Sequence, residues 1–102
     1  MAFIPANRNL FVIDLHYVVP LDHIDPHLAG HRRFLEDNYA SGRLLASGAK
    51  VPRTGGVILA VAGSRNEVET LIQKDPFHEA EIARYTITEF EPRMTVPGLK
   101  DD

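Results

Sequence analysis

Apolar and polar residues alternate along this chain with two different periods, and each period predicts one kind of secondary structure. Residues 10–19 are rich in β-branched and aromatic side chains and alternate with a period of two, which predicts a β-strand. One face would carry Phe11, Ile13, Leu15 and Tyr17, and the other Val12, Asp14, His16 and Val18. Asp14 and His16 are polar within an otherwise apolar strand, so they either line a cleft or mark a wetter face of the sheet.

After Pro20 the apolar residues recur with the period of an α-helix. The expected helix begins at Asp22 or at Asp25-Pro26, where an acidic residue precedes a proline, and runs to about Ala40. One side collects Ile24, Leu28, Phe34, Leu35 and Tyr39, and the other Asp22, Asp25, Arg32, Arg33, Glu36 and Asp37. His31 falls inside the apolar stripe, where burial disfavours a charged imidazole. It is either a core histidine bonded to a backbone carbonyl or a functional group, and its partner from elsewhere in the chain decides.

The rest of the chain predicts three more strands and a second helix. Residues 44–51 form a strand, 52–56 a turn, and 56–62 a nearly continuous apolar run typical of a central strand. Ser64 and Glu67 have the capping-box spacing, and Val68, Leu71 and Ile72 form the buried stripe of the helix that follows. Asp75-Pro76-Phe77 ends that helix, residues 77–82 make one more turn, and 84–90 form the last strand. Residues 1–9 are expected to be a loose lead-in and 93–102 a tail with a mobile end at 100–102.

This order of elements is βαββαβ, which predicts an α+β, ferredoxin-like fold: a four-stranded antiparallel sheet with two helices on one face. The other face stays uncovered. One alternating set of the apolar run would then meet solvent, either Val57, Leu59 and Val61 or Ile58, Ala60 and Ala62. Because pairing two such faces removes apolar area from water, we expect a homodimer through the open sheet face.

Composition narrows the functional classes. The 102 residues predict a single domain, 1–102, with 44% hydrophobic and 25% charged residues and a net charge of −3. No basic patch suits nucleic acid, and no apolar run suits a membrane, so a cytoplasmic protein is the default expectation. Cysteine is absent, which excludes disulfides and thiol nucleophiles. We expect no cofactor.

Few side chains are candidates for chemistry. Asp75 is either a turn residue that bonds nearby backbone N–H groups or the partner of His31, in which case the carboxylate would hold one imidazole tautomer. His23, His27 and His31 lie four residues apart, but no third metal ligand is evident, so no metal site is expected. Ser47-Gly48 lacks the context of a nucleophile elbow. Arg53 either binds an anion or is a surface charge, the commoner case.

Five segments in order resemble the YciI-like (YCII-related) family. They are His31-Arg-Arg-Phe-Leu35, residues 42–48 (GRLLASG), residues 51–60 (VPRTGGVILA), Asp75-Pro-Phe77 and residues 85–90 (YTITEF). The resemblance implies a ferredoxin-like subunit of a dimeric α/β barrel, with a site built on His31 and Asp75. Two positions depart from the family pattern: Ala49 replaces a proline, and Glu81 stands where a glycine often follows Asp-Pro-Phe.

The resemblance leaves the reaction open, since most members have none assigned; one related activity removes chloride from a chlorinated hydroxyhydroquinone. The first hypothesis is a small lyase or isomerase in which His31 is the acid or base on a cyclic or phenolic metabolite and Asp75 orients it. His16, Asp14 and Ser47 are weaker candidates for substrate binding. The second hypothesis is a ligand-binding or accessory module without turnover, and the third is a purely structural His31–Asp75 pair.

Overall fold

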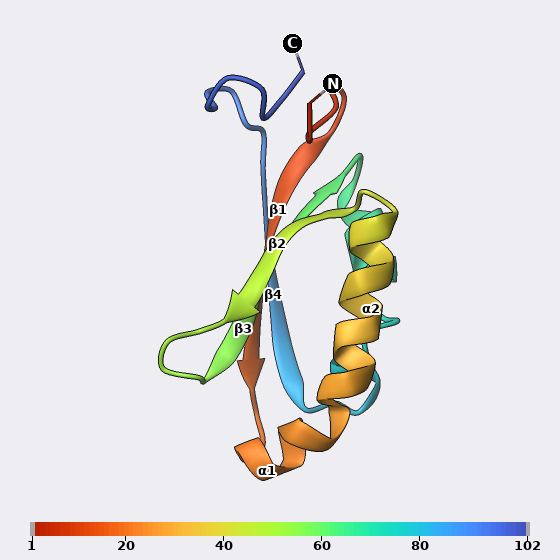
Figure 1. The fold of residues 1–102 in the computed structure, drawn as a ribbon, viewed down its shortest axis with the longest axis vertical. Helices are drawn as coiled ribbons and strands as arrows, with labels where there is room; N and C mark the ends of the chain where they lie inside the picture. Colours follow the sequence, from red (N-terminus) through yellow and green to blue (C-terminus); the bar gives the residue numbers. More distant parts are fainter. Residues whose placement is uncertain (1, 102) are drawn as a thin grey trace.

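The first predicted strand lies inside a four-stranded antiparallel sheet of order β2-β3-β1-β4 (Figure 1). In this computed structural model, which describes residues 2–101, β1 (Asn9–Tyr17) pairs with β3 (Gly55–Ala62) and with β4 (Ala83–Phe90). The edge strand β2 (Leu44–Ala49) pairs with β3. The predicted ferredoxin-like order is confirmed.

The first predicted helix is three segments rather than one. They are α1 (Leu21–Ile24), the single 3-10 turn η1 (Asp25–His27) and α2 (Leu28–Ala40). Asp25 does not cap a helix with its side chain; its carboxylate accepts a hydrogen bond from Arg53 Nη2 instead, at 2.8 Å. Since Pro26 has no backbone N–H to donate, the chain breaks its helical ladder at this point.

The inward face of α2 is rotated slightly from the predicted stripe. Phe34 is buried as expected, whereas Tyr39 is exposed and Asn38 is buried in its place. The Asn38 side chain donates to the carbonyl oxygen of Phe34 at 2.7 Å, which satisfies this buried polar group.

Two short helices precede β4. In α3 (Arg65–Ile72), Ser64 Oγ accepts from the Glu67 backbone N–H, as the capping spacing predicts. The helix α4 (Pro76–Glu79) is capped by Asp75, whose side chain accepts from the Phe77 N–H. At its other end, Ile82 N–H donates to Phe77 O and Glu81 N–H to His78 O, the Schellman pattern.

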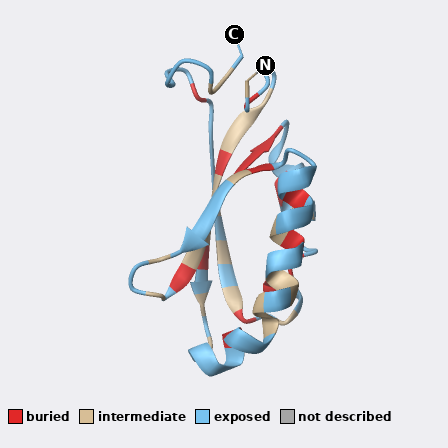
Figure 2. Ribbon diagram, viewed as in Figure 1, coloured by how far each residue is buried: buried red, intermediate tan, exposed pale blue. Residues whose placement is uncertain are grey.

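The core lies between the helices and one face of the sheet (Figure 2). Alternate residues of the two central strands are buried there: Phe11, Ile13 and Leu15 of β1, and Ile58, Ala60 and Ala62 of β3. Val12, Val57 and Leu59 lie on the opposite face and are half-buried. The two strands approach closely at Gly55, where an added Cβ would lie 1.8 Å from the Leu15 carbonyl oxygen.

The two ends of the chain pair with each other, in contrast to the loose lead-in and mobile end expected. Ile4 is fully buried, and its N–H and carbonyl bond Leu99 O and Asp101 N–H, each at 2.9 Å. A parallel bridge joins Ile4 to Lys100. Met1 and Asp102 lie outside the described residues. Within residues 2–101, no helix is long and apolar enough to cross a membrane.

Candidate active site

The fold brings His31 of α2 to Asp75, the residue that caps α4. His31 Nδ1 lies 2.8 Å from Asp75 Oδ1. The Asp75 side chain is fully buried, and the His31 side chain is 12% exposed. Because an ionised carboxylate only accepts hydrogen bonds, His31 Nδ1 carries the proton and Nε2 is the ring nitrogen left for a ligand.

Asp75 accepts hydrogen bonds from three groups. Oδ1 takes the Phe77 backbone N–H at 3.0 Å besides His31, and Oδ2 takes the Tyr85 hydroxyl at 2.7 Å. Burial, reinforced by the negative charge of Asp75, raises the pKa of Tyr85 above its ordinary value, so this hydroxyl keeps its proton and donates. Three donors thus compensate the carboxylate for the loss of water.

The ring plane of His31 is fixed by stacking. Its centroid lies 4.0 Å from that of Phe77, with 3° between the planes. Phe77 is buried in the core. The imidazole is therefore held through one nitrogen by Asp75 and through one face by Phe77.

A cleft of about 430 Å³ opens beside the imidazole, between α2 and the strands β1, β2 and β3. Its polar or charged lining residues are Tyr17, His31, Arg32, Ser47 and Arg53. Its apolar walls include Leu15, Leu28, Leu35, Ile58 and Phe77. This volume lies within the range of small-molecule sites, so the cleft has room for a single-ring ligand against His31.

A family model for the YCII-related domain matches residues 10–91. The chain belongs to this family. The matched range contains His31, Asp75 and Tyr85, and it leaves out the paired ends of the chain. No curated protein matches the sequence.

Among solved structures, the YCII-related chain is similar to 5-chloro-2-hydroxyhydroquinone dehydrochlorinase from Burkholderia phenoliruptrix, solved in complex with 2,5-dihydroxybenzoquinone. The TM-score is 0.71 and the sequence identity 22%, over 80% of this chain and 93% of that chain. At this identity the likeness shows the fold.

Of the three candidate binding residues of this YCII-related chain, one lines the cleft and two do not. Ser47 lines the cleft, and its hydroxyl lies 2.7 Å from that of Tyr39. Asp14 and His16 do not line it, because side chains alternate along β1 and those of Leu15 and Tyr17 face the cleft instead. Asp14 pairs with Lys50 at 2.8 Å, and His16 is exposed.

Sequence reasoning overlooked Tyr85, and it placed Arg53 in a turn as either an anion-binding residue or a surface charge. In the sequence, Tyr85 is one residue of a predicted strand with nothing to single it out. It reaches Asp75 because β4 pairs with β1. Arg53 lies over the Tyr17 ring at 5.9 Å, and its hydrogen bond to Asp25 raises the pKa of the guanidinium. It lines the cleft with a side chain that is 35% exposed, which suits the anion-binding alternative that the sequence left open.

In the described part of the chain, residues 2–101, the histidine row is spread over three segments, with His23 on α1, His27 on η1 and His31 on α2. No group of three or more His, Asp or Glu side chains there is arranged to hold a metal ion. Of the three histidines in the row, only His31 lines the cleft.

Proposed function

We propose that this protein is a small acid–base enzyme acting on a cyclic or phenolic metabolite. The observation that carries the proposal is the buried Asp75 carboxylate bonded to His31 Nδ1 at 2.8 Å, with the imidazole lining a cleft of about 430 Å³. An imidazole with one nitrogen fixed and the other available is a typical general base near neutral pH.

In this proposal His31 Nε2 removes a proton from the substrate. The electron pair of the broken bond moves into the ring system and expels a leaving group such as chloride, or it moves the position of a double bond. Asp75 stabilises the imidazolium that forms, and Tyr85 and the Phe77 N–H keep the carboxylate oriented. His31 then returns the proton to product or solvent. Elimination and isomerisation both follow this course.

The structural neighbour supports the substrate class. That protein is named as a dehydrochlorinase of a chlorinated hydroxyhydroquinone and was solved with 2,5-dihydroxybenzoquinone, a single ring with oxygen substituents. A ring of that size suits the cleft here, whose walls are apolar and whose polar groups are few.

We also propose that the protein works as a homodimer paired through its open sheet face. Val12, Val57 and Leu59 are half-buried apolar residues on that face, which no helix within residues 2–101 covers (Figure 1). Burial of apolar area contributes about 25 cal/mol per Å², so pairing of the faces favours association.

The experiment screens phenols, quinols and lactones for binding by thermal shift and for product, with chloride release measured for chlorinated compounds. We expect His31→Asn and Asp75→Asn to lower turnover at least about 100-fold, since general acid–base groups contribute roughly that much. His23→Asn is the matched control, because His23 is an exposed histidine of α1 outside the cleft. It should keep the wild-type rate.

Three results separate the readings. Loss of turnover in both variants, with circular dichroism spectra like the wild type, supports the enzyme. Binding without product from any compound favours the ligand-binding module. Full turnover in either variant rules out the acid–base assignment, and a lower melting temperature with unchanged binding leaves the pair a structural role only.

A further inference from the structure

The cleft beside His31 carries charge of one sign. Arg32 and Arg53 line it, and among the residues that the structure describes no aspartate or glutamate does. Asp75 is sealed beneath His31 with no exposed surface. The contrast with the whole chain, whose net charge is −3, is sharp. A ligand in the cleft therefore meets cationic groups without a competing carboxylate in the wall.

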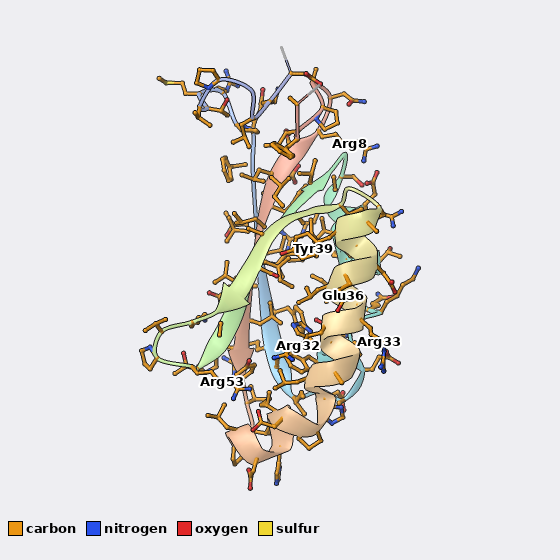
Figure 3. All side chains as sticks on the ribbon, in the orientation of Figure 1. Arg8, Arg32, Arg33, Glu36, Tyr39 and Arg53 are labelled. Atoms are coloured by element: carbon orange, nitrogen blue, oxygen red, sulfur yellow. The ribbon has the colours of Figure 1, made fainter. Side chains whose placement is uncertain are left out.

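Arg32 is free to bind a ligand. Its side chain extends from α2 on the side of the sheet, whereas that of Arg33 extends away from it (Figure 3). Among residues 2–101, no carboxylate forms a salt bridge with Arg32. An arginine has five N–H donors in a planar fork, which matches a carboxylate or two adjacent ring oxygens.

Arg53 is held in place from two sides. Its Nη2 donates to Asp25 at 2.8 Å, and its guanidinium lies 5.9 Å from the centroid of the Tyr17 ring. These contacts come from η1 and from the end of β1, so they fix a side chain that belongs to the β2–β3 turn. Asp25 accepts from one nitrogen of the fork, and the same side chain lines the cleft.

We infer that this cleft selects ring compounds that carry a negative charge, with Arg32 as the main recognition group and Arg53 as the second. The charge is a carboxylate or an ionised hydroxyl on the ring. The inference rests on the proposed function, because it names the substrate class of the same site. It also assigns a specificity role to two residues that take no part in the proton transfer.

Equilibrium binding tests this inference without any turnover. Isothermal titration calorimetry at low salt compares 2,5-dihydroxybenzoate with the neutral 2,5-dihydroxybenzamide, and 2,5-dihydroxybenzoquinone with the neutral 2,5-dimethoxybenzoquinone. The first pair tests a carboxylate and the second an ionised hydroxyl. We expect the anion of at least one pair to bind about tenfold tighter than its neutral partner, as one charge-assisted hydrogen bond would give. Equal binding within both pairs, or no binding by either anion, overturns the inference.

Variants assign the preference to residues. Arg32→Gln should remove most of the preference for the anion, and Arg32→Lys should keep part of it, since the charge remains but the fork is lost. Arg33→Gln is the matched control and should bind like the wild type. An undiminished preference in Arg32→Gln overturns the role of Arg32. The His31→Asn variant should keep the preference, so a failure of the acid–base proposal is seen separately in turnover.

Discussion

At the scale of single residues, the Asp75 carboxylate joins a structural role, the helix cap, to the chemical role proposed for it. It caps α4 through the Phe77 N–H and orients His31 through Nδ1, while Tyr85 closes its remaining side. A cap whose position is fixed by the helix it begins is a rigid support for an imidazole. Cap and orienting group are thus one side chain, and a change at residue 75 acts on both.

Tyr85 makes the protein lose stability as the pH rises into the alkaline range. Burial raises the pKa of its phenol in the folded state, whereas the unfolded chain has the ordinary value of about 10. Stability from this group is therefore fully present below about pH 10 and falls as pH rises further, because only the unfolded state then loses the proton. The slope is at most about 1.4 kcal/mol per pH unit.

We expect Tyr85→Phe to be less stable than the wild type at pH 7 by roughly 1–2 kcal/mol, because a buried hydrogen bond to a carboxylate is lost. Above pH 10 the variant should lose stability less steeply. Urea unfolding followed by circular dichroism between pH 7 and 11.5 measures both effects. Parallel curves over the whole range would contradict this account of Tyr85.

His31 and Asp75 could each be singled out from the sequence, but the contact between them could not be predicted. His31 stood out because it interrupts an apolar stripe, and Asp75 because it precedes a proline at a helix end. Their hydrogen bond joins residues 44 positions apart, and the closeness of two such residues is set by the packing of α2 against α4. Tyr85 and Arg53 depend on tertiary packing in the same way, and local patterns carry no information about it.

At the scale of elements, the end of α4 explains a departure from the family pattern. Glu81 has a φ of 56°, the left-handed conformation that glycine adopts without cost. It is the residue after the cap of a Schellman turn, where glycine is most common. The glycine expected from the resemblance would fit this position, and the glutamate occupies it under backbone strain.

We expect Glu81→Gly to stabilise the protein by about 1 kcal/mol, since a side chain in the left-handed region costs roughly that much. Thermal unfolding should show a rise of about 4–8 °C for a domain of this size. Glu81→Ala is the control, because alanine removes the carboxylate but keeps the Cβ, and it should melt near the wild-type temperature. A similar gain in both variants would mean that charge, not backbone strain, is responsible.

The types of the main helices and strands could be predicted from the sequence, whereas several of their boundaries, and the division of the first helix into segments, could not. Apolar residues that recur with a period of two predicted the strands, and a period of 3.6 predicted the main helices. Pro20 marked the end of the first strand, and Ser64 marked the start of a helix. The sequence offered Asp22 or Asp25-Pro26 as the helix start, but it did not indicate a break with helical segments on both sides, because an acidic residue before proline typically starts a helix. The pairing of Ile4 with Lys100 was missed because a single bridge between chain ends has no periodicity.

At the scale of the whole molecule, one face of the sheet is packed and the other is open. The open face combines the apolar residues Val12, Val57 and Leu59 with the Asp14–Lys50 ion pair. Asp14 lies directly opposite Val57 in the strand pairing, so the ion pair sits beside these apolar residues on the open face and outside the cleft. Protein interfaces commonly combine apolar and polar groups in this way, which supports the proposed dimer.

Light scattering coupled to size-exclusion chromatography tests the dimer. We expect the wild type to have about twice the subunit mass of 11.4 kDa, and Leu59→Glu to be monomeric because it would bury an unpaired charge in the interface. Thr70→Glu on the exposed side of α3 is the control and should remain a dimer. A monomeric wild type at micromolar concentration would exclude the proposed assembly.

The paired ends of the chain have a practical consequence. Ile4 and Lys100 meet beyond the start of β1, near the N and C labels of Figure 1. The cleft lies toward the other end of β1, at Leu15 and Tyr17, and the strand from Asn9 to Leu15 is about 20 Å long. A short peptide linker could join the two ends into a circular permutant, with new ends opened in a loop. A surface tether or fluorescent reporter fused at either end would sit well clear of any bound ligand, so immobilised protein should keep its full binding capacity.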